Sequence, residues 1–180
     1  MQADAGTADE YIAFAGRLSK EKGIDILAEA AKRLPEYRFC IAGGGPDGEC
    51  LENIPNVTMM GFLTGEKLVR FMANAKVMIV PSVWYENCPL SILEALSMGV
   101  PVITVNSGGM AELVDDGKTG TLASAADVQS IVDAIEKTVG NAEYYATVKS
   151  NCATVHESIL DVEAYCEILL GKYKDLIEQR

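Results

Sequence analysis

Two carboxylates, Glu86 and Glu94, lie eight positions apart with Pro89 between them. Proline is favoured in the first turn of a helix, so we predict a loop through Glu86 and a helix over 89–97. Glu94 then lies about 7.5 Å along this helix, at 1.5 Å per residue. The helix is apolar on most sides, which predicts that it is buried and that Glu94 needs a partner. Its free N–H groups favour a ligand with a phosphate at one end and hydroxyl groups nearby.

A second set of candidate residues lies in turns closer to the start of the chain. Arg17 and Lys22 can neutralise a diphosphate, the first as a bidentate fork and the second as a point charge. Two solvated loop cations are the alternative, but the neighbouring helix start in an acidic protein favours phosphate binding. The glycine run at 43–45 lets the backbone approach a ligand closely, although a plain tight turn also fits it. It is not a dinucleotide fingerprint, because residues 47–49 are typical of a turn where the fingerprint needs a helix.

Other catalytic chemistries fit these residues less well. A hydrolytic pair of Glu86 and Glu94 is disfavoured, because one lies before the helix and the other lies inside it. Cys88 lies at the helix start, where a thiolate is favoured. The single histidine, His156, is far away in the sequence, and a catalytic cysteine would need such a base close by.

Three aromatic residues lie near the same loops. Phe62 follows the end of a predicted strand, so both a wall for a nucleobase and a core position fit it. Trp84 and Tyr85 directly precede Glu86, and we expect them to pack beside the loop rather than to stack on a base.

The composition excludes several partners. The chain of 180 residues fits one domain, and its formal net charge is −11. Nucleic acids and anionic membranes attract basic surfaces, so neither is expected as a partner. No apolar run approaches the roughly 20 residues that span a bilayer, and no signal peptide is recognised at the start. The five cysteines form no C-x-x-C pair, which disfavours a zinc site or a disulfide framework and favours a reducing, cytoplasmic location.

Short apolar strands that alternate with helices must position these residues. We predict strands at 11–15, 38–42, 57–60, 77–80 and 102–105, with an edge strand at 120–122. We predict helices at 24–34, 65–74, 89–97 and 110–114, followed by a helical tail at 127–139, 143–158 and 160–179. This order predicts an α/β fold with a Rossmann-like parallel sheet of about five to six strands flanked by helices. Such sheets bind ligands outside the carboxyl ends of their strands, where the glycine turns, the two cations and both glutamates fall.

Several motifs occur in an order that resembles a known enzyme family. They are Gly16-Arg17-Leu18, Glu21-Lys22-Gly23, the turn from Gly43 to Pro46, Glu86-x7-Glu94 with the run that follows it to Ile103, Gly108-Gly109-Met110-Ala111-Glu112 and Asp116-Gly117-Lys118-Thr119-Gly120. Together they resemble the family 4 retaining glycosyltransferases, also called group 1, over roughly residues 11–122. The resemblance implies the C-terminal, nucleotide-sugar-binding half of the two-domain GT-B fold.

The resemblance also implies roles for individual residues. Arg17 and Lys22 would contact the donor diphosphate, Glu94 the ribose and Glu86 the transferred sugar. The candidate donor-binding residues are Gly16, Arg17, Lys22, Gly43, Gly44, Gly45, Gly61, Phe62, Glu86, Asn87, Cys88, Pro89, Leu90, Ser91 and Glu94. The catalytic candidates among them are Arg17, Lys22 and Glu86, since the cations and the helix start would stabilise the departing diphosphate. Transfer in the family is independent of metal, so we expect no cofactor, and the nucleotide sugar is the substrate.

The sequence departs from the family pattern in three places. The stretch between Gly45 and Val57 is short, and Asn87-Cys88 replaces commoner residues beside the sugar pocket. The N-terminal domain that carries acceptor contacts in the family is missing. We therefore expect residues 1–10 to be a linker or an added tail and 11–180 to be the donor-binding domain. Its last helix, at 159–180, would reach toward the missing domain or pair two copies of the chain.

Three other functions are less favoured. A sugar-nucleotide epimerase of the same architecture would bring more histidines and carboxylates to the site. A non-catalytic, partner-binding Rossmann-like module would not need the nucleotide-site residues. An NAD-dependent oxidoreductase would need the fingerprint that is missing after the first strand.

Overall fold

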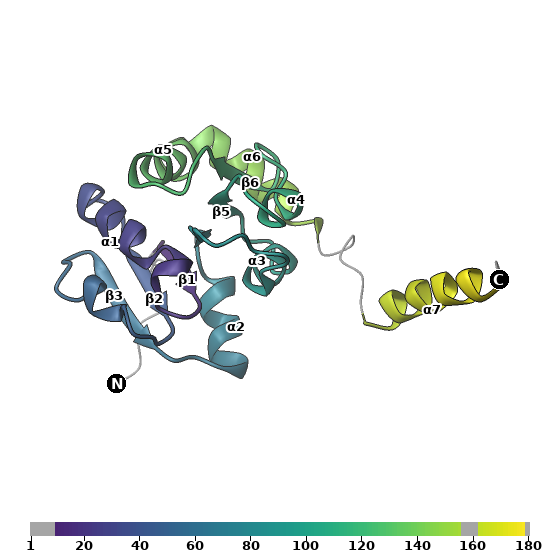
Figure 1. Ribbon diagram of the computed structural model, residues 1–180. Coiled ribbons are helices and arrows are strands. Elements are labelled where there is room, and N and C mark those ends of the chain that lie inside the picture. The colour runs from purple at the N-terminus through teal and green to yellow at the C-terminus, as the bar shows by residue number, and fades with distance from the viewer. Residues whose placement is uncertain (1–9, 156–161, 179–180) are drawn as a thin grey trace.

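The structure is a computed structural model that describes residues 10–155 and 162–178. Its sheet contains β1 (Ile12–Ala15), β2 (Phe39–Ala42), β3 (Val57–Gly61), β4 (Val77–Val80), β5 (Val102–Val105) and β6 (Gly120–Ala123). The helices are α1 (Ile24–Arg33), α2 (Gly65–Ala73), α3 (Leu90–Ser97), α4 (Met110–Leu113), α5 (Val128–Val139), α6 (Ala142–Cys152) and α7 (Val162–Glu178), with short 3₁₀ turns η1 (Lys20–Lys22) and η2 (Gly48–Leu51). The predicted α/β architecture is confirmed (Figure 1).

The strand order is β3-β2-β1-β4-β5-β6, and all the strand pairings are parallel. The chain runs outward from β1 to β3, crosses back to β4 and then runs outward in the other direction. Helices α1 and α5 pack against each other, whereas α2 packs on β1 and α3 packs on β4 and β5. The direction of the connections reverses between the neighbours β1 and β4, and such a switch point opens a crevice at the carboxyl ends of the strands.

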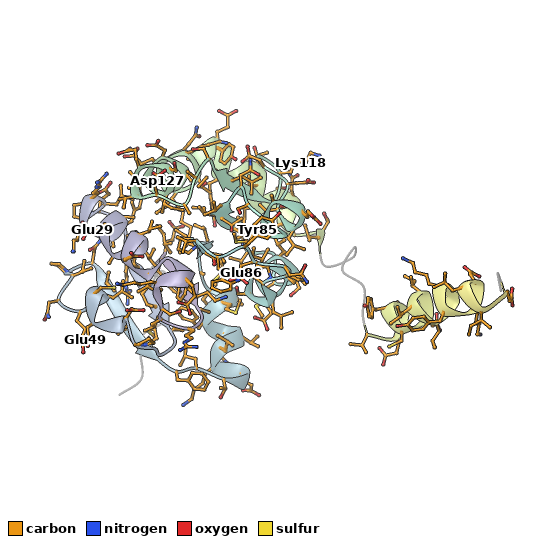
Figure 2. All side chains as sticks on the ribbon, viewed as in Figure 1. Glu29, Glu49, Tyr85, Glu86, Lys118 and Asp127 are labelled. Atoms are coloured by element: carbon orange, nitrogen blue, oxygen red, sulfur yellow. The ribbon has the colours of Figure 1, made fainter. Side chains whose placement is uncertain are left out.

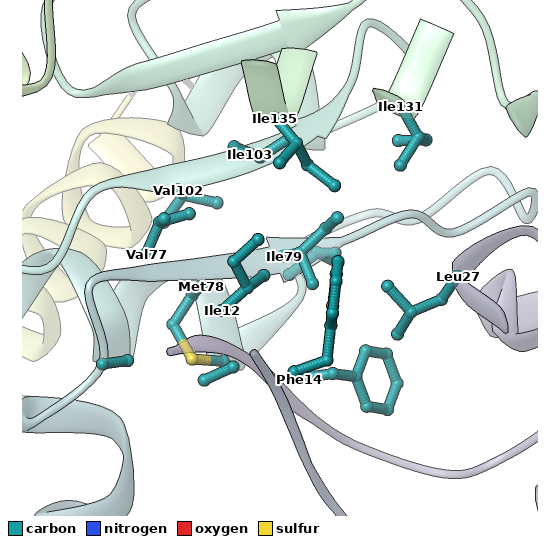
Figure 3. Close-up of a cluster of buried hydrophobic side chains, with 14 of the residues drawn as sticks. Ile12, Phe14, Leu27, Val77, Met78, Ile79, Val102, Ile103, Ile131 and Ile135 are labelled. Atoms are coloured by element: carbon teal, nitrogen blue, oxygen red, sulfur yellow. The ribbon is translucent and has the colours of Figure 1, made fainter. Parts of the chain in front are cut away.

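The central strands are continuous apolar runs, which is expected for a parallel sheet that helices cover on both faces. Charged side chains lie at the periphery, as Glu29 and Asp127 do (Figure 2). Figure 3 shows the interior, where Ile79 of β4 and Ile103 of β5 are fully buried. The buried central strands therefore position the loops at the crevice.

Most predicted boundaries agree with the structure within one or two residues, and one does not. The helix predicted over 143–158 ends at Cys152, so this boundary is wrong. The last prediction, a helix over 160–179, corresponds to α7. His156, the single histidine, lies outside the described residues.

The two ends of the described chain differ in their packing. Glu10 forms an ion pair with Lys76, which precedes β4, and the rest of the predicted linker lies outside the described residues. Helix α7 stands apart from the sheet (Figure 1). Its exposed large apolar residues are Val162, Tyr165, Ile168, Leu170, Tyr173, Leu176 and Ile177. That α7 contacts an N-terminal domain or a second copy stays a prediction.

The five cysteines divide into two classes that a thiol reagent should separate. Cys40 and Cys152 are buried, whereas Cys50, Cys88 and Cys166 are exposed. Burial raises the pKa of the Cys152 thiol to about 11, so little reactive thiolate forms there at neutral pH. We expect a colorimetric thiol reagent to modify three thiols rapidly in the native protein and all five in guanidinium chloride. Rapid modification of a fourth thiol without denaturant would contradict this packing.

Candidate functional site

A pocket of about 410 Å³ opens at the carboxyl ends of β1 and β2. This volume is in the range of small-molecule sites. Seven predicted site residues line the pocket, and they are Gly16, Arg17, Gly43, Gly44, Phe62, Ser91 and Glu94. Five chain segments therefore meet at this pocket: the loops after β1, β2 and β3, and helices α2 and α3.

One side of the pocket is apolar and the other is polar. The apolar side is formed by Phe62 and Leu63, which follow β3, and by Leu68 of α2. Phe62 is 81% exposed, so the alternative of a core position is wrong. Leu63 and Leu68 are lining residues that the sequence reasoning missed, although the place of Leu63 just after a strand end could have indicated it. A flat apolar ring fits this side, with polar groups of the same ligand at Arg17 and Glu94.

Glycines in the β2 loop allow close contact with the β1 loop. A Cβ at Gly43, whose φ is +144°, would lie 1.8 Å from the carbonyl oxygen of Gly16. A Cβ at Gly45 would lie 2.3 Å from the Leu18 carbonyl oxygen. Only Gly44 of the three has open space, since no atom of the described chain lies within 4 Å of a Cβ placed there. Gly43 and Gly45 thus serve loop packing, and Gly44 alone leaves room for a ligand beside the backbone.

Lys22 and Glu86 form an ion pair at the switch point between β1 and β4. The Lys22 Nζ lies 2.5 Å from the Glu86 Oε1, and the Ser82 Oγ lies 3.0 Å from the same oxygen. The Glu86 side chain is only 15% exposed. Neither Lys22 nor Glu86 lines the nearby pocket. The pair therefore forms a second, charged part of the site, and Ser82 is a component that the sequence reasoning missed.

Backbone contacts hold the two loops of this pair together. The Glu21 carbonyl oxygen accepts hydrogen bonds from the N–H groups of Val83 and Trp84, at 3.1 and 3.2 Å. Gly23 has φ +72°, and a Cβ there would lie 2.0 Å from the Pro81 carbonyl oxygen. The Glu21 carboxyl has a lowered pKa, because its own backbone N–H and the Ser19 hydroxyl, and then Arg17 and Lys22, favour the charged form. The loop after β1 thus presents cations whose charge one ionised carboxylate partly offsets.

A glycine pair after β5 supports the loop that carries Glu86. The Gly109 N–H donates to the Glu86 carbonyl oxygen at 2.8 Å, and a Cβ at Gly109 would lie 1.6 Å from the carbonyl oxygen of Asn87. Gly108 and Gly109 belong to a motif noted in the sequence, but their role as a support appears only in three dimensions. Asn87 and Cys88 are exposed on the loop that they hold.

A Gly109→Ala substitution tests this support. The added methyl group must displace the Asn87 carbonyl, so we expect a loss of about 1–3 kcal/mol in the free energy of unfolding. Gly44→Ala is the matched control, because its methyl group enters open space, and we expect a change within about 0.5 kcal/mol. Urea unfolding followed by circular dichroism measures both. Equal stability of the two variants would contradict the close contact.

Helix α3 differs from its prediction in two ways. It begins at Leu90, and Pro89 is the N-cap with φ −67° and ψ 113° rather than part of the first turn. The prediction of a buried Glu94 is wrong, because Glu94 is exposed at the pocket. Leu90 is 67% exposed, and only Ile92, Ala95 and Leu96 of this helix are buried. The helix start is therefore open to a ligand.

Two further findings concern the described residues as a whole. No three histidine, cysteine, aspartate or glutamate side chains among them cluster as ligands for a metal ion. None of the helices described combines the length and the apolar character that a membrane crossing requires.

The predicted site residue Gly61, with φ +68°, lies at the end of β3. Its carbonyl oxygen accepts a hydrogen bond from the Gly43 N–H at 2.8 Å.

Residues 2–154 match the family of glycosyl transferases group 1. The chain belongs to this family. A GDP-mannose-dependent alpha-mannosyltransferase of Corynebacterium glutamicum is 30% identical to it over 177 residues, which are 97% of this chain and 42% of that protein. A D-inositol 3-phosphate glycosyltransferase of Mycobacterium avium is 30% identical over 183 residues, which are 95% of this chain and 43% of that protein. The group 1 chain thus spans less than half the length of these relatives.

Solved structures with the same fold agree with this assignment. Sucrose-phosphate synthase from Thermosynechococcus elongatus matches with a TM-score of 0.80 at 26% identity, over 97% of this chain and 47% of that one. Anabaena HepE in complex with UDP matches with a TM-score of 0.79 at 24% identity, over 93% of this chain and 49% of that one. The C-terminal domain of a group 1 glycosyl transferase, LpcC from Francisella tularensis, matches with a TM-score of 0.72 at 19% identity. The match covers 85% of this chain and 87% of that one. The predicted C-terminal half of the GT-B fold is confirmed.

Proposed function

We propose that this group 1 chain binds the nucleoside diphosphate of a UDP- or GDP-sugar and presents the sugar for retaining transfer. The observation that carries the proposal is the meeting of Arg17, Ser91 and Glu94 in one pocket beside the Lys22–Glu86 pair. The dependence of one relative on GDP-mannose and the UDP in a structural relative support both nucleotides as candidates.

Each part of the donor has a partner in the proposed complex. The base lies against the exposed ring of Phe62, and the Glu94 carboxylate accepts hydrogen bonds from the ribose hydroxyls. Arg17 and the open N-terminus of α3 face the diphosphate, because guanidinium groups and helix N–H groups both favour phosphate oxygens. The sugar then lies beside Glu86.

Charge compensation by Lys22 is the central chemical feature of this proposal. When the bond between the sugar and the diphosphate breaks, negative charge develops on the departing phosphate oxygen. In the proposed complex Lys22, which is paired with Glu86, contacts that oxygen, and a fixed cation in a partly buried site stabilises such charge. Glu86, held by Lys22 and Ser82, is oriented to accept hydrogen bonds from the sugar hydroxyls.

The remaining parts of the proposal concern the whole protein. We assign residues 11–180 to the donor-binding domain, with α7 reaching an N-terminal half that binds the acceptor or pairing two copies of the chain. The chain alone would then turn over poorly, because that N-terminal half would supply most of the acceptor contacts. None of the five cysteines forms a disulfide in the described part of the chain, and three of them are exposed, which supports a reducing, cytoplasmic compartment.

Calorimetric titration tests the donor site directly. We expect UDP or GDP to bind this chain with a Kd on the order of 0.1 mM, because a partly open site gives modest affinity. Uridine and guanosine should bind far more weakly, since they lack the diphosphate that Arg17 and Lys22 would contact. Absence of heat and of chemical-shift changes with either nucleotide at millimolar concentration would refute the proposal.

A further inference from the structure

Large apolar side chains are exposed on the loop that carries Glu86. Trp84 is 64% exposed, Tyr85 is 78% exposed, and Val83 and Leu90 beside them are also open to solvent. An exposed cluster of this kind marks a binding surface more often than a single exposed residue does. We call Trp84 and Tyr85 together the aromatic ledge.

The backbone of the ledge is fixed, so the exposure is a property of a rigid loop. The N–H groups of Val83 and Trp84 both donate to the Glu21 carbonyl oxygen, and the Glu86 N–H donates to the Trp84 carbonyl oxygen at 2.9 Å. The Glu86 carbonyl is in turn held by Gly109. A loop fixed at both ends presents its side chains without a large entropic cost on binding.

Tyr85 and the Glu86 carboxylate lie on different sides of this loop. Two atoms of the Tyr85 ring lie 3.3 and 3.4 Å from the position of a Cβ at Gly108, so the ring packs at the glycine turn after β5. The Glu86 carboxylate instead points to Lys22 in the loop after β1. Figure 2 labels both residues next to each other. The ring of Tyr85 therefore faces the loop after β5, whereas the carboxylate of Glu86 faces the loop after β1.

We propose that the aromatic ledge binds the pyranose ring of a sugar acceptor, an inference that rests on the proposed function. A pyranose ring has polarised C–H bonds on its faces and hydroxyl groups at its rim. The negative part of an aromatic ring's quadrupole lies over its faces, which attract the polarised C–H bonds. Tyr and Trp also combine a large apolar area with a polar tip. Neither Trp84 nor Tyr85 lines the nucleotide pocket, and the adjacent Glu86 pairs with Lys22 in the loop after β1. This position assigns the ledge to the acceptor rather than to the donor.

Trp84 is the single tryptophan of the chain, so its fluorescence reports on the ledge alone. The experiment titrates methyl α-D-glucopyranoside and methyl α-D-mannopyranoside into the chain with bound UDP or GDP, with sorbitol as an acyclic control. We expect a saturable emission change for at least one glycoside, with a Kd on the order of 10 mM, and none for sorbitol. Tyr85→Ala should weaken that Kd at least about fivefold, whereas Tyr85→Phe keeps the ring and the response. Tyr173→Ala, which removes an exposed ring on α7, is the matched control.

Separate outcomes distinguish failure of this inference from failure of the proposed function. If UDP or GDP binds in the calorimeter but neither glycoside changes Trp84 emission up to about 300 mM, well above that expected Kd, the acceptor assignment is overturned. If UDP-glucose or GDP-mannose alters the emission and the glycosides do not, the ledge holds the donor sugar and the assignment is also overturned. If neither nucleotide binds, the proposed function itself fails. Unchanged nucleotide affinity in Tyr85→Ala supports a ledge that is separate from the donor pocket.

Discussion

Glu94→Ala is expected to weaken UDP or GDP binding by about 10- to 100-fold, the equivalent of one or two hydrogen bonds to a charged group. The carboxylate is exposed at the pocket and carries none of the core packing of α3, which involves Ile92, Ala95 and Leu96. The free energy of unfolding should therefore stay within about 0.5 kcal/mol of the original value. Calorimetry and urea unfolding on the same preparation measure the two quantities.

A sharper version of this prediction uses the ribose. If Glu94 accepts hydrogen bonds from the ribose hydroxyls, 2′-deoxy UDP should bind the original chain more weakly than UDP does, and Glu94→Ala should reduce this difference. Glu143→Ala removes an exposed glutamate near the start of α6 and should change neither affinity. A Glu94→Ala variant that loses its cooperative unfolding transition would instead assign the residue a structural role.

Lys22→Met should have two separate effects, one on binding and one on stability. Removing the ammonium group deletes a charge-assisted contact to the diphosphate, so nucleotide affinity should fall by about 30- to 300-fold. It also leaves the carboxylate of Glu86 without its cation in a site that is mostly shielded from water. We expect a loss of about 1–2 kcal/mol in the free energy of unfolding, between the values for exposed and for buried pairs.

A double variant separates the two effects of the Lys22 substitution. Glu86→Gln removes the uncompensated charge, so Lys22→Met/Glu86→Gln should regain most of the stability and none of the nucleotide affinity. Lys20→Met removes an exposed lysine of the same turn and serves as the control. Recovery of nucleotide binding in the double variant would mean that Lys22 acts only through Glu86 and does not contact the diphosphate.

The alternation of apolar strands and helices was sufficient to predict the fold. Runs such as the one at 77–80 lie in a parallel sheet that is covered on both faces, so every residue of such a strand is apolar. The same logic placed Arg17, Lys22, Glu86 and Glu94 at one edge of the sheet. Local sequence carries this information because the carboxyl ends of parallel strands always face the same way.

Features that depend on tertiary packing were not accessible in the same way. The apolar composition of residues 89–97 predicts a buried helix, but Leu90 and Glu94 are exposed in the folded chain. The support of Asn87 by Gly109 joins loops after different strands, and no local pattern indicates that contact. Whether Ser82 meets Glu86 likewise depends on the curvature of one loop.

The pairing of Lys22 with Glu86 has a consequence for how the chain folds. The two residues are 64 positions apart and follow β1 and β4, the neighbouring strands at which the two halves of the sheet meet. Contacts of such high sequence separation form slowly. A nucleotide that needs both loops therefore binds only the fully folded chain, and at 100 times its Kd it adds about 2.7 kcal/mol to stability. For a domain of this length that corresponds to a rise in melting temperature of roughly 5–10 °C. A simple thermal-shift screen of nucleotides would thus report on the assembly of the entire sheet.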